Sequence, residues 1–197
     1  MAEHRPEKST RADKTAQRRQ LIVEAAAKLF ILKGFHQTGM RDIAGEAGIS
    51  LGNLYNHFNG KHEIIAAIAE IEASEMEPLL NLLDSVSADG SAALAEFAEA
   101  YFAICSSPEN AALSAEIVAE IFRNPEAGGA FLKTRARLIG ALERHIPDVY
   151  SSRTATAGLV LDLIERAGQS AVGTTAASQK EIRASLLEIL TRVIEPS

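Results

Sequence analysis

The sequence predicts an all-α protein, with an N-terminal three-helix head that contains a helix-turn-helix and a larger C-terminal helical domain. Hydrophobic residues make up 47% of the 197-residue chain, which is enough to bury a core. Aromatic residues make up only 5% and tryptophan is absent. This composition favours helices over the β-branched and aromatic runs of a sheet protein. Apolar residues also recur at helical spacing through most of the chain.

The first elements expected are a polar, disordered arm over residues 1–14 and an amphipathic helix over residues 15–33. The helix is indicated by apolar residues at i, i+3, i+4 and i+7, namely Leu21, Ile22, Ala25, Ala26, Leu29 and Phe30. Gly34 follows directly and is a natural residue to end a helix. The head is therefore expected over residues 15–61.

A tight helix-turn-helix is expected next. An apolar stripe of Met40, Ile43, Ala44 and Ala47 stops at Gly48, and Ser50 is a good N-cap for a further short helix. That helix would bury Leu54 and Phe58 at i and i+4. Its outer side would then carry Leu51, Gly52, Tyr55 and Asn56. This outer side is the one that would enter the major groove of DNA.

The remaining chain, residues 62–197, is expected to form a helical ligand-binding and dimerisation domain. Its helices are expected over about 62–86, 91–106, 108–123, 126–145, 154–172 and 178–194. Pro108, Pro125 and Pro147 separate several of them, and Asp89-Gly90 marks a turn. The sequence shows no internal repeat and no low-complexity tract.

Charge is divided unevenly along the chain. Residues 1–61 carry ten Lys and Arg against six Asp and Glu, whereas residues 62–197 carry ten against twenty. A basic head on an acidic body is typical of a protein that binds nucleic acid at one end, because phosphate attraction supplies much of the affinity. Charge alone is equally compatible with drift of the surface composition.

The composition indicates a cytoplasmic protein. Cys105 is the sole cysteine, so no internal disulfide can form. Residues 1–20 are charged throughout and lack the apolar stretch of a signal peptide. No apolar run approaches the roughly 20 residues needed to span a bilayer, so no membrane partner is expected.

The head resembles the tetracycline-repressor (TetR) family over roughly residues 15–65. The resemblance is carried by Gly34-Phe35-His36-Gln37-Thr38, Asp42-Ile43-Ala44, Ala47-Gly48-Ile49-Ser50, Gly52-Asn53-Leu54-Tyr55, His57-Phe58 and Lys61. It implies nine or so helices, a two-fold homodimer on operator DNA, and a C-terminal pocket. In this family the pocket binds a small-molecule inducer that lowers DNA affinity. The resemblance does not identify the inducer.

The resemblance implies a set of DNA contacts: Arg41, Leu51, Gly52, Asn53, Tyr55, Asn56, His57 and Lys61. Arg41 would contact a base or phosphate, Leu51 and Gly52 would approach base edges, and Lys61 would pair with a phosphate. His57 could equally be a structural histidine. Two positions depart from the family pattern. Leu51 replaces a polar residue, and Gly39 replaces a hydroxyl residue, which leaves Thr38 to cap the helix.

In the C-terminal domain, the candidate ligand residues are Phe97, Tyr101, Glu116, Glu120, Ile121 and Arg137. Most apolar residues there must be plain core, because a pocket uses few polar groups among many apolar ones. The last two helices carry apolar stripes that include Leu159, Leu163, Ile182, Leu186 and Leu190. The family places its dimer interface there, which favours a core shared by two subunits.

Two other classes of function were weighed against this interpretation. Gly48-Ile49-Ser50-Leu51-Gly52 matches the G-x-S-x-G pattern of hydrolases, but that serine should follow a strand rather than cap a helix. His57 and His62 are five residues apart and lack zinc-motif spacing. A helical interaction adaptor that never touches DNA remains the alternative. The sequence therefore predicts a ligand-responsive transcriptional repressor with no catalytic residues, no cofactor and no metal.

Overall fold

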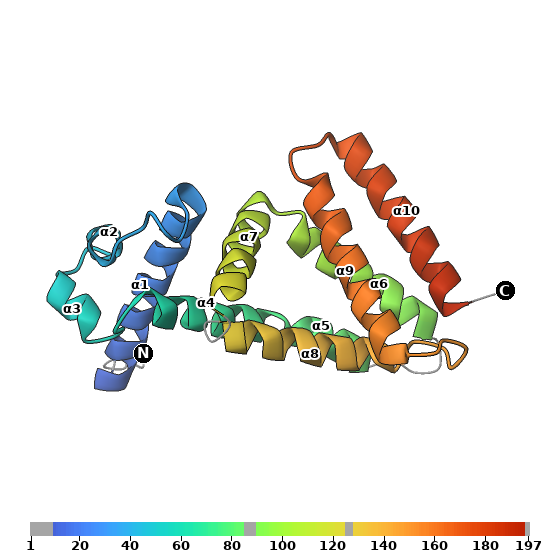
Figure 1. The fold of residues 1–197 in the computed structure, drawn as a ribbon, viewed down its shortest axis with the longest axis horizontal. Coiled ribbons are helices and arrows are strands. Elements are labelled where there is room, and N and C mark those ends of the chain that lie inside the picture. The colour runs from blue at the N-terminus through green and yellow to red at the C-terminus, as the bar shows by residue number, and fades with distance from the viewer. Residues whose placement is uncertain (1–9, 85–89, 125–127, 196–197) are drawn as a thin grey trace, which may run out of the picture. The chain divides into compact units, whose positions relative to one another are not determined.

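The computed structural model describes residues 10–84, 90–124 and 128–195, and these residues form helices joined by turns and loops, with no strand among them. This confirms the predicted all-α class (Figure 1). The ten helices of these residues are α1 (Arg11–Lys33), α2 (Met40–Glu46), α3 (Leu51–Tyr55), α4 (Lys61–Glu75), α5 (Glu77–Asp84), α6 (Gly90–Cys105), α7 (Pro108–Arg123), α8 (Gly129–Glu143), α9 (Arg153–Ala171) and α10 (Ala176–Ile194).

The chain divides into two compact units, Met1–Ile68 and Ala69–Ser197. The expected border lay between residues 61 and 62, where α4 begins. The structure instead divides the chain inside α4 (Lys61–Glu75), so that this helix contributes residues to both units. The first half of α4 closes the core of the head with Ile64 and Ile65, which are 0% and 2% exposed.

Helix α1 begins earlier than expected. The Thr10 hydroxyl accepts a hydrogen bond from the backbone N–H of Asp13 (3.2 Å), and the Asp13 carboxylate accepts one from the Thr10 N–H (2.7 Å). This reciprocal pair is a capping box, which satisfies two N–H groups at the helix start. Residues 11–14 are therefore helical, which corrects the prediction of a disordered arm up to residue 14. Residues 1–9 of that arm lie outside the described residues.

The single helix expected over residues 62–86 is two helices. Helix α4 ends at Glu75 and α5 begins at Glu77, and the expected end of the long helix lies beyond Asp84, outside the described residues. Pro78 explains the division, because proline lacks an N–H and clashes inside a helix but is tolerated in its first turn. The apolar run that surrounds Pro78 masked this signal. The division also gives ten described helices where the family resemblance implied about nine.

Helix α9 lies at the centre of the C-terminal unit, where it packs against α6, α8 and α10. Figure 1 shows α10 alongside α9, and α5 alongside α8. Leu94, Phe97, Leu142, Leu161 and Ile164 are fully buried in the core that these helices share.

Helices α6 and α9 approach closely at Gly168. A Cβ atom at this position would lie 2.5 Å from the Cβ of Cys105, so only glycine permits this approach. In the part of the chain that the structure describes, no helix is long and apolar enough to cross a bilayer.

Candidate nucleic-acid interface and effector cavity

The turn between α2 and α3 is built around Gly48. The Ile49 N–H donates to the Ala44 carbonyl (2.9 Å), and the Gly48 N–H donates to the Gly45 carbonyl (3.2 Å). These two bonds form a Schellman motif, which places the residue after the helix cap in the left-handed region. Gly48 has φ +64° there, a conformation that glycine adopts without strain. The sequence therefore makes the sharp turn that a helix-turn-helix requires.

Helix α3 begins as the sequence predicts. The Ser50 hydroxyl accepts a hydrogen bond from the Asn53 N–H (3.2 Å), which confirms Ser50 as the N-cap and assigns it a structural role. Leu54 is 0% exposed and anchors the helix to the head. Phe58 is also buried, but it lies beyond the end of α3 at Tyr55, which corrects its expected place inside the helix.

The opposite side of α3 faces solvent. Gly52, Tyr55 and Asn56 are exposed, and Leu51, Asn53 and His57 are half-buried. A Cβ at Gly52 would have no neighbour within 4 Å, so this point of the surface is open to close approach by another molecule. Asn56 and His57 follow the last residue of the helix. Arg41 is exposed on α2.

The start of α2 differs from the expected capping. Gly39 is the N-cap, and its N–H donates to the Asp42 carboxylate at 2.8 Å. Thr38 is 1% exposed, and its hydroxyl donates to the carbonyls of Gly34 (2.9 Å) and Leu29 (3.3 Å). The prediction that Thr38 caps α2 is therefore wrong. Its hydroxyl instead stabilises the end of α1.

Lys61 occupies a site that the sequence did not indicate. Its ammonium donates to the carbonyl of Phe35 at 2.6 Å and to that of His36 at 3.5 Å. It also lies 4.4 Å from the centre of the Phe35 ring, within cation–π range. Lys61 thus joins the start of α4 to the loop that follows α1.

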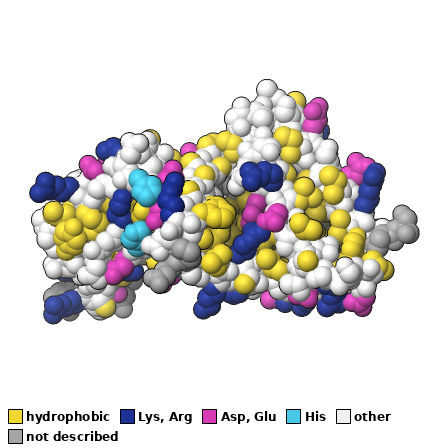
Figure 2. Space-filling model, viewed as in Figure 1, with side chains coloured by type: hydrophobic (Ala, Val, Ile, Leu, Met, Phe, Trp, Pro, Cys, Tyr) yellow, Lys and Arg dark blue, Asp and Glu magenta, His cyan; other side chains and the backbone are white. Residues whose placement is uncertain are grey.

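Arg19 makes a second link that sequence analysis missed. Its guanidinium lies 4.2 Å from the centre of the Phe58 ring and donates to the carbonyl of His57 at 3.3 Å. These contacts fix the segment after α3 to α1. A positively charged residue in an amphipathic helix gives no sequence signal for such a role. Figure 2 shows cationic side chains (dark blue) and histidines (cyan) on the visible face of the head.

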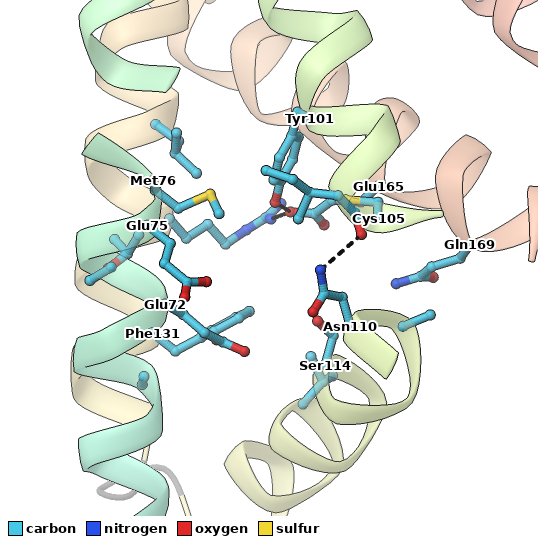
Figure 3. Close-up of a pocket in the computed structure, with 18 residues that line it drawn as sticks. Glu72, Glu75, Met76, Tyr101, Cys105, Asn110, Ser114, Phe131, Glu165 and Gln169 are labelled. Atoms are coloured by element: carbon cyan, nitrogen blue, oxygen red, sulfur yellow. Dashed lines mark hydrogen bonds and ion pairs between the residues drawn. The ribbon is translucent and has the colours of Figure 1, made fainter. Parts of the chain in front are cut away.

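A cavity of about 120 Å³ lies within the C-terminal unit. Its walls come from α4, α6, α7, α8 and α9, and Figure 3 shows Glu72 and Glu75 on the α4 wall, with Met76 directly after the end of that helix. The described lining residues are Ala69, Glu72, Ala73, Glu75, Met76, Tyr101, Ile104, Cys105, Asn110, Ala111, Ser114, Val118, Phe131, Thr134, Arg135, Leu138, Glu165 and Gln169. Apolar side chains with a few polar groups are typical of a small-molecule site.

One end of the cavity holds a closed polar network. The Arg135 guanidinium pairs with the carboxylates of Glu165 (2.7 Å) and Asp162, and the Tyr101 hydroxyl donates to Glu165 at 2.9 Å. Burial, together with the charge of Glu165, raises the pKa of the Tyr101 hydroxyl well above its usual range. Burial also raises the pKa of the Cys105 thiol to about 12. Both groups therefore stay protonated at neutral pH.

The α4 wall carries a perturbed carboxyl group. Desolvation raises the pKa of Glu72 to about 7, and the nearby charge of Glu75 adds to the shift. Glu72 is half-buried, whereas Glu75 lies exposed at the rim. The sequence did not indicate either residue, because apolar spacing does not show which face of α4 points into the C-terminal unit.

The candidate ligand residues have different fates. Tyr101 lines the cavity, while Ile121 lines an adjoining open groove of α7, α8 and α9. Phe97 is a fully buried core residue, and the exposed Arg137 pairs with Glu77 at 2.6 Å, so neither lines the cavity. Glu116 and Glu120 lie on α7 but are not among the residues that line the cavity. Glu120 is buried, 4.0 Å from Arg123.

The candidate dimer residues also separate into two groups. Leu159 is 69% exposed on α9, and Leu163 and Ile182 are half-buried. Leu186 and Leu190 are only 2% and 1% exposed, because they pack inside the core of their own protomer. The prediction that these two leucines lie in a dimer interface is therefore corrected. Spacing alone could not tell which side of α10 faces α6 and α9.

A helix-turn-helix head is typical of DNA-binding regulators. Comparisons with known proteins point to the same class. The family described as "Bacterial regulatory proteins, tetR family" matches residues 22–68. The regulator SrpR of Pseudomonas putida is 39% identical over 61 residues, which span 31% of this chain and 27% of SrpR.

Solved structures match over nearly the whole chain. Salmonella enterica GusR has a TM-score of 0.74 and 25% identity, and the match covers 94% of this chain and 98% of GusR. A TetR-family transcriptional regulator of Pectobacterium atrosepticum has a TM-score of 0.61 at 21% identity, over 92% of this chain and 93% of its own. Residues 22–68 therefore match the TetR family of bacterial regulatory proteins, and the fold of the chain resembles that of solved TetR-family regulators.

Proposed function

We propose that this protein is a transcriptional regulator that binds operator DNA as a homodimer, with α3 of each head in the major groove. The observation that carries the proposal is the helix-turn-helix itself. A glycine turn and a serine cap present a short helix whose inner side is anchored by Leu54 and whose outer side is exposed. The family match over residues 22–68 supports the same function.

The proposed contacts are those implied by the family pattern. Leu51 and Gly52 approach base edges, where the leucine side chain suits a thymine methyl group. Asn53, Tyr55, Asn56 and His57 contact the backbone or bases, and Arg41 contacts a base or phosphate. The exposure of Arg41, Gly52 and Tyr55 supports their assignment.

Lys61 requires a modified role. Its ammonium group donates to the carbonyls of Phe35 and His36, so part of its role is structural. We propose that Lys61 positions the start of α4 and adds its charge to the phosphate-binding face of the head. A purely electrostatic role would not need the 2.6 Å bond to Phe35.

We further propose that a small-molecule inducer binds the cavity and releases the protein from DNA, which makes it a repressor. Two heads must fit successive major grooves about 34–36 Å apart, so a small shift of each head is sufficient to disrupt both contacts. Helix α4 supports such coupling, because it begins in the N-terminal unit and its last turns line the cavity. The inducer must bind the released state more tightly.

Selection of bound fragments from genomic DNA tests the DNA-binding proposal. We expect the wild-type protein to enrich a palindromic sequence with half-sites about one helical turn apart. The Arg153→Ala variant should enrich the same sequence and serves as a control, because it removes one positive charge from the C-terminal unit and none from the head. Absence of any enriched sequence at low salt would contradict the proposal and favour a helical interaction adaptor.

A further inference from the structure

The two sides of the cavity in the C-terminal unit differ in charge. Arg135 is the only basic residue among the described lining residues, and Glu165 and Asp162 already neutralise it. The α4 wall carries the carboxyl groups of Glu72 and Glu75, and neither makes an ion pair with the described residues. Figure 3 shows both on the same side of the cavity, across from Asn110 and Gln169. The cavity therefore offers uncompensated negative charge on one wall.

This charge is costly in the absence of a ligand. A half-buried carboxylate next to a second one loses hydration and meets like-charge repulsion, so its protonated form is favoured. The raised pKa of Glu72 is the expected result. A cation that enters the cavity would reverse this preference, because opposite charge within about 4–6 Å favours the ionised carboxylate. An anion would add to the repulsion.

We propose that the cavity binds a compact organic cation, a protonated amine carried on a single small ring or short chain, with its ammonium on Glu72 and Glu75. This inference rests on the proposal that the cavity is the effector site. The apolar part of the ligand would pack against the apolar lining residues, which include Phe131, Leu138 and Ile104. Apolar walls with one charged anchor are the arrangement that orients a small amphipathic ligand.

Size sets a limit on the ligand. The cavity measures about 120 Å³. An engineered apolar cavity of roughly 150 Å³ is known to hold benzene. A single ring with a short amine arm therefore fits if the arm reaches the rim at Glu75. A larger ligand would extend into the adjoining groove, which shares Phe131 and Glu165 with the cavity.

Isothermal titration calorimetry on the full chain tests the charge preference with three probes of similar size: benzylamine, benzyl alcohol and benzoate. At pH 8 we expect benzylamine to bind about tenfold more tightly than benzyl alcohol, the difference that one charge-assisted hydrogen bond supplies. Benzoate should bind more weakly than the alcohol. Equal affinities for benzylamine and benzyl alcohol, or no binding of benzylamine, would overturn the proposal.

The pH dependence gives a second readout on the unmodified protein. Glu72 becomes protonated as pH falls through about 7, while benzylamine stays protonated in this range. The other titratable groups that line the cavity are Glu75 on α4, Tyr101 and Cys105 on α6, Arg135 on α8 and Glu165 on α9, and no histidine is among the described lining residues. Benzylamine affinity should therefore fall from pH 8 to pH 6 with proton uptake by Glu72. An unchanged affinity would contradict the assignment.

Matched variants identify the residue. Glu72→Gln should remove the roughly tenfold preference for benzylamine and leave the affinity for benzyl alcohol unchanged. Glu70→Gln is the control, because Glu70 is exposed on the same helix and does not line the cavity. A folded Glu72→Gln protein that keeps the full preference would overturn the proposal.

Operator affinity measured on the same samples separates this inference from the proposed function. Retained operator binding without any preference for the cation would refute the ligand class alone. Tight benzylamine binding that leaves operator affinity unchanged would support the ligand class and contradict regulation through this cavity.

Discussion

Lys61 shows how one side chain combines a structural and an electrostatic role. Its contacts with the Phe35 carbonyl and ring hold the start of α4 on the head. We expect Lys61→Ala to weaken DNA binding for all sequences and to lower the salt dependence of binding by about one unit. Because the Phe35 contacts are also lost, the thermal midpoint of the variant should fall.

Lys28→Ala is the control for this prediction, since Lys28 is exposed and pairs with Glu46 at the surface of the head. Fluorescence anisotropy at several salt concentrations and a thermal melt measure the two effects separately. A Lys61→Ala protein with unchanged salt dependence would leave Lys61 a structural role only.

Glu72 makes a prediction about stability. Its folded-state pKa of about 7 lies above the ordinary 4.5, so the folded protein holds this proton more tightly than the unfolded chain does. Its contribution is therefore fully present below about pH 4.5 and is lost as pH rises through 7. Glu72→Gln should raise the thermal midpoint at pH 8, and the gain should shrink towards pH 5.

With allowance for solvent screening, we expect a gain of about 2–4 °C, which corresponds to ~1 kcal/mol in a chain of this length. Differential scanning calorimetry across this pH range measures it. A variant less stable than the wild type at pH 8 would show that Glu72 makes favourable interactions in the folded protein.

At the scale of helices, an exposed leucine and a buried leucine allow dimer assembly and protomer folding to be tested separately. Leu159 is 69% exposed on α9, so Leu159→Glu should leave the protomer folded and place an unpaired charge in the proposed dimer interface. Sedimentation should show a monomer at micromolar concentration. Leu186→Glu instead buries a charge in the protomer core and should prevent folding.

A dimeric Leu159→Glu protein would place the interface elsewhere, and a monomeric wild type would refute the dimer. Exposed apolar side chains on the C-terminal unit include Phe122 and Leu132, which are 84% and 48% exposed. They line the same open groove as Leu159.

Local signals predicted the helices where caps and glycines act within a few residues. Ser50 caps α3, and Gly48 forms the turn, as the sequence indicates. Pro78 was missed because the apolar period continues across it, and only the structure shows α5 beginning there. The short-range sequence pattern therefore predicts where a helix forms better than it predicts where a helix is interrupted.

For the whole molecule, apolar periodicity identified the helices, but it did not show which of their apolar residues are buried or which neighbour each helix face contacts. Leu186 and Leu159 both lie on apolar stripes with helical spacing. Leu186 is nevertheless buried in the core, whereas Leu159 is exposed. The cavity draws its lining from five helices, so its polar residues could not be selected from spacing. The tertiary structure decides which face of a helix packs against which neighbour. This explains why the sequence did not indicate Glu72 and Arg135.

The central claim is that the head binds DNA through the exposed side of α3 and the adjoining α2. The most direct measurement is the affinity of the selected operator duplex for wild type, for the Arg41→Ala/Tyr55→Ala double variant and for the Arg153→Ala control. Both head residues are exposed, so the double variant should stay folded. We expect it to lose at least about tenfold in affinity, since each lost contact costs roughly 1–3 kcal/mol, while the control stays near wild type. Wild-type affinity in the folded double variant would contradict the account.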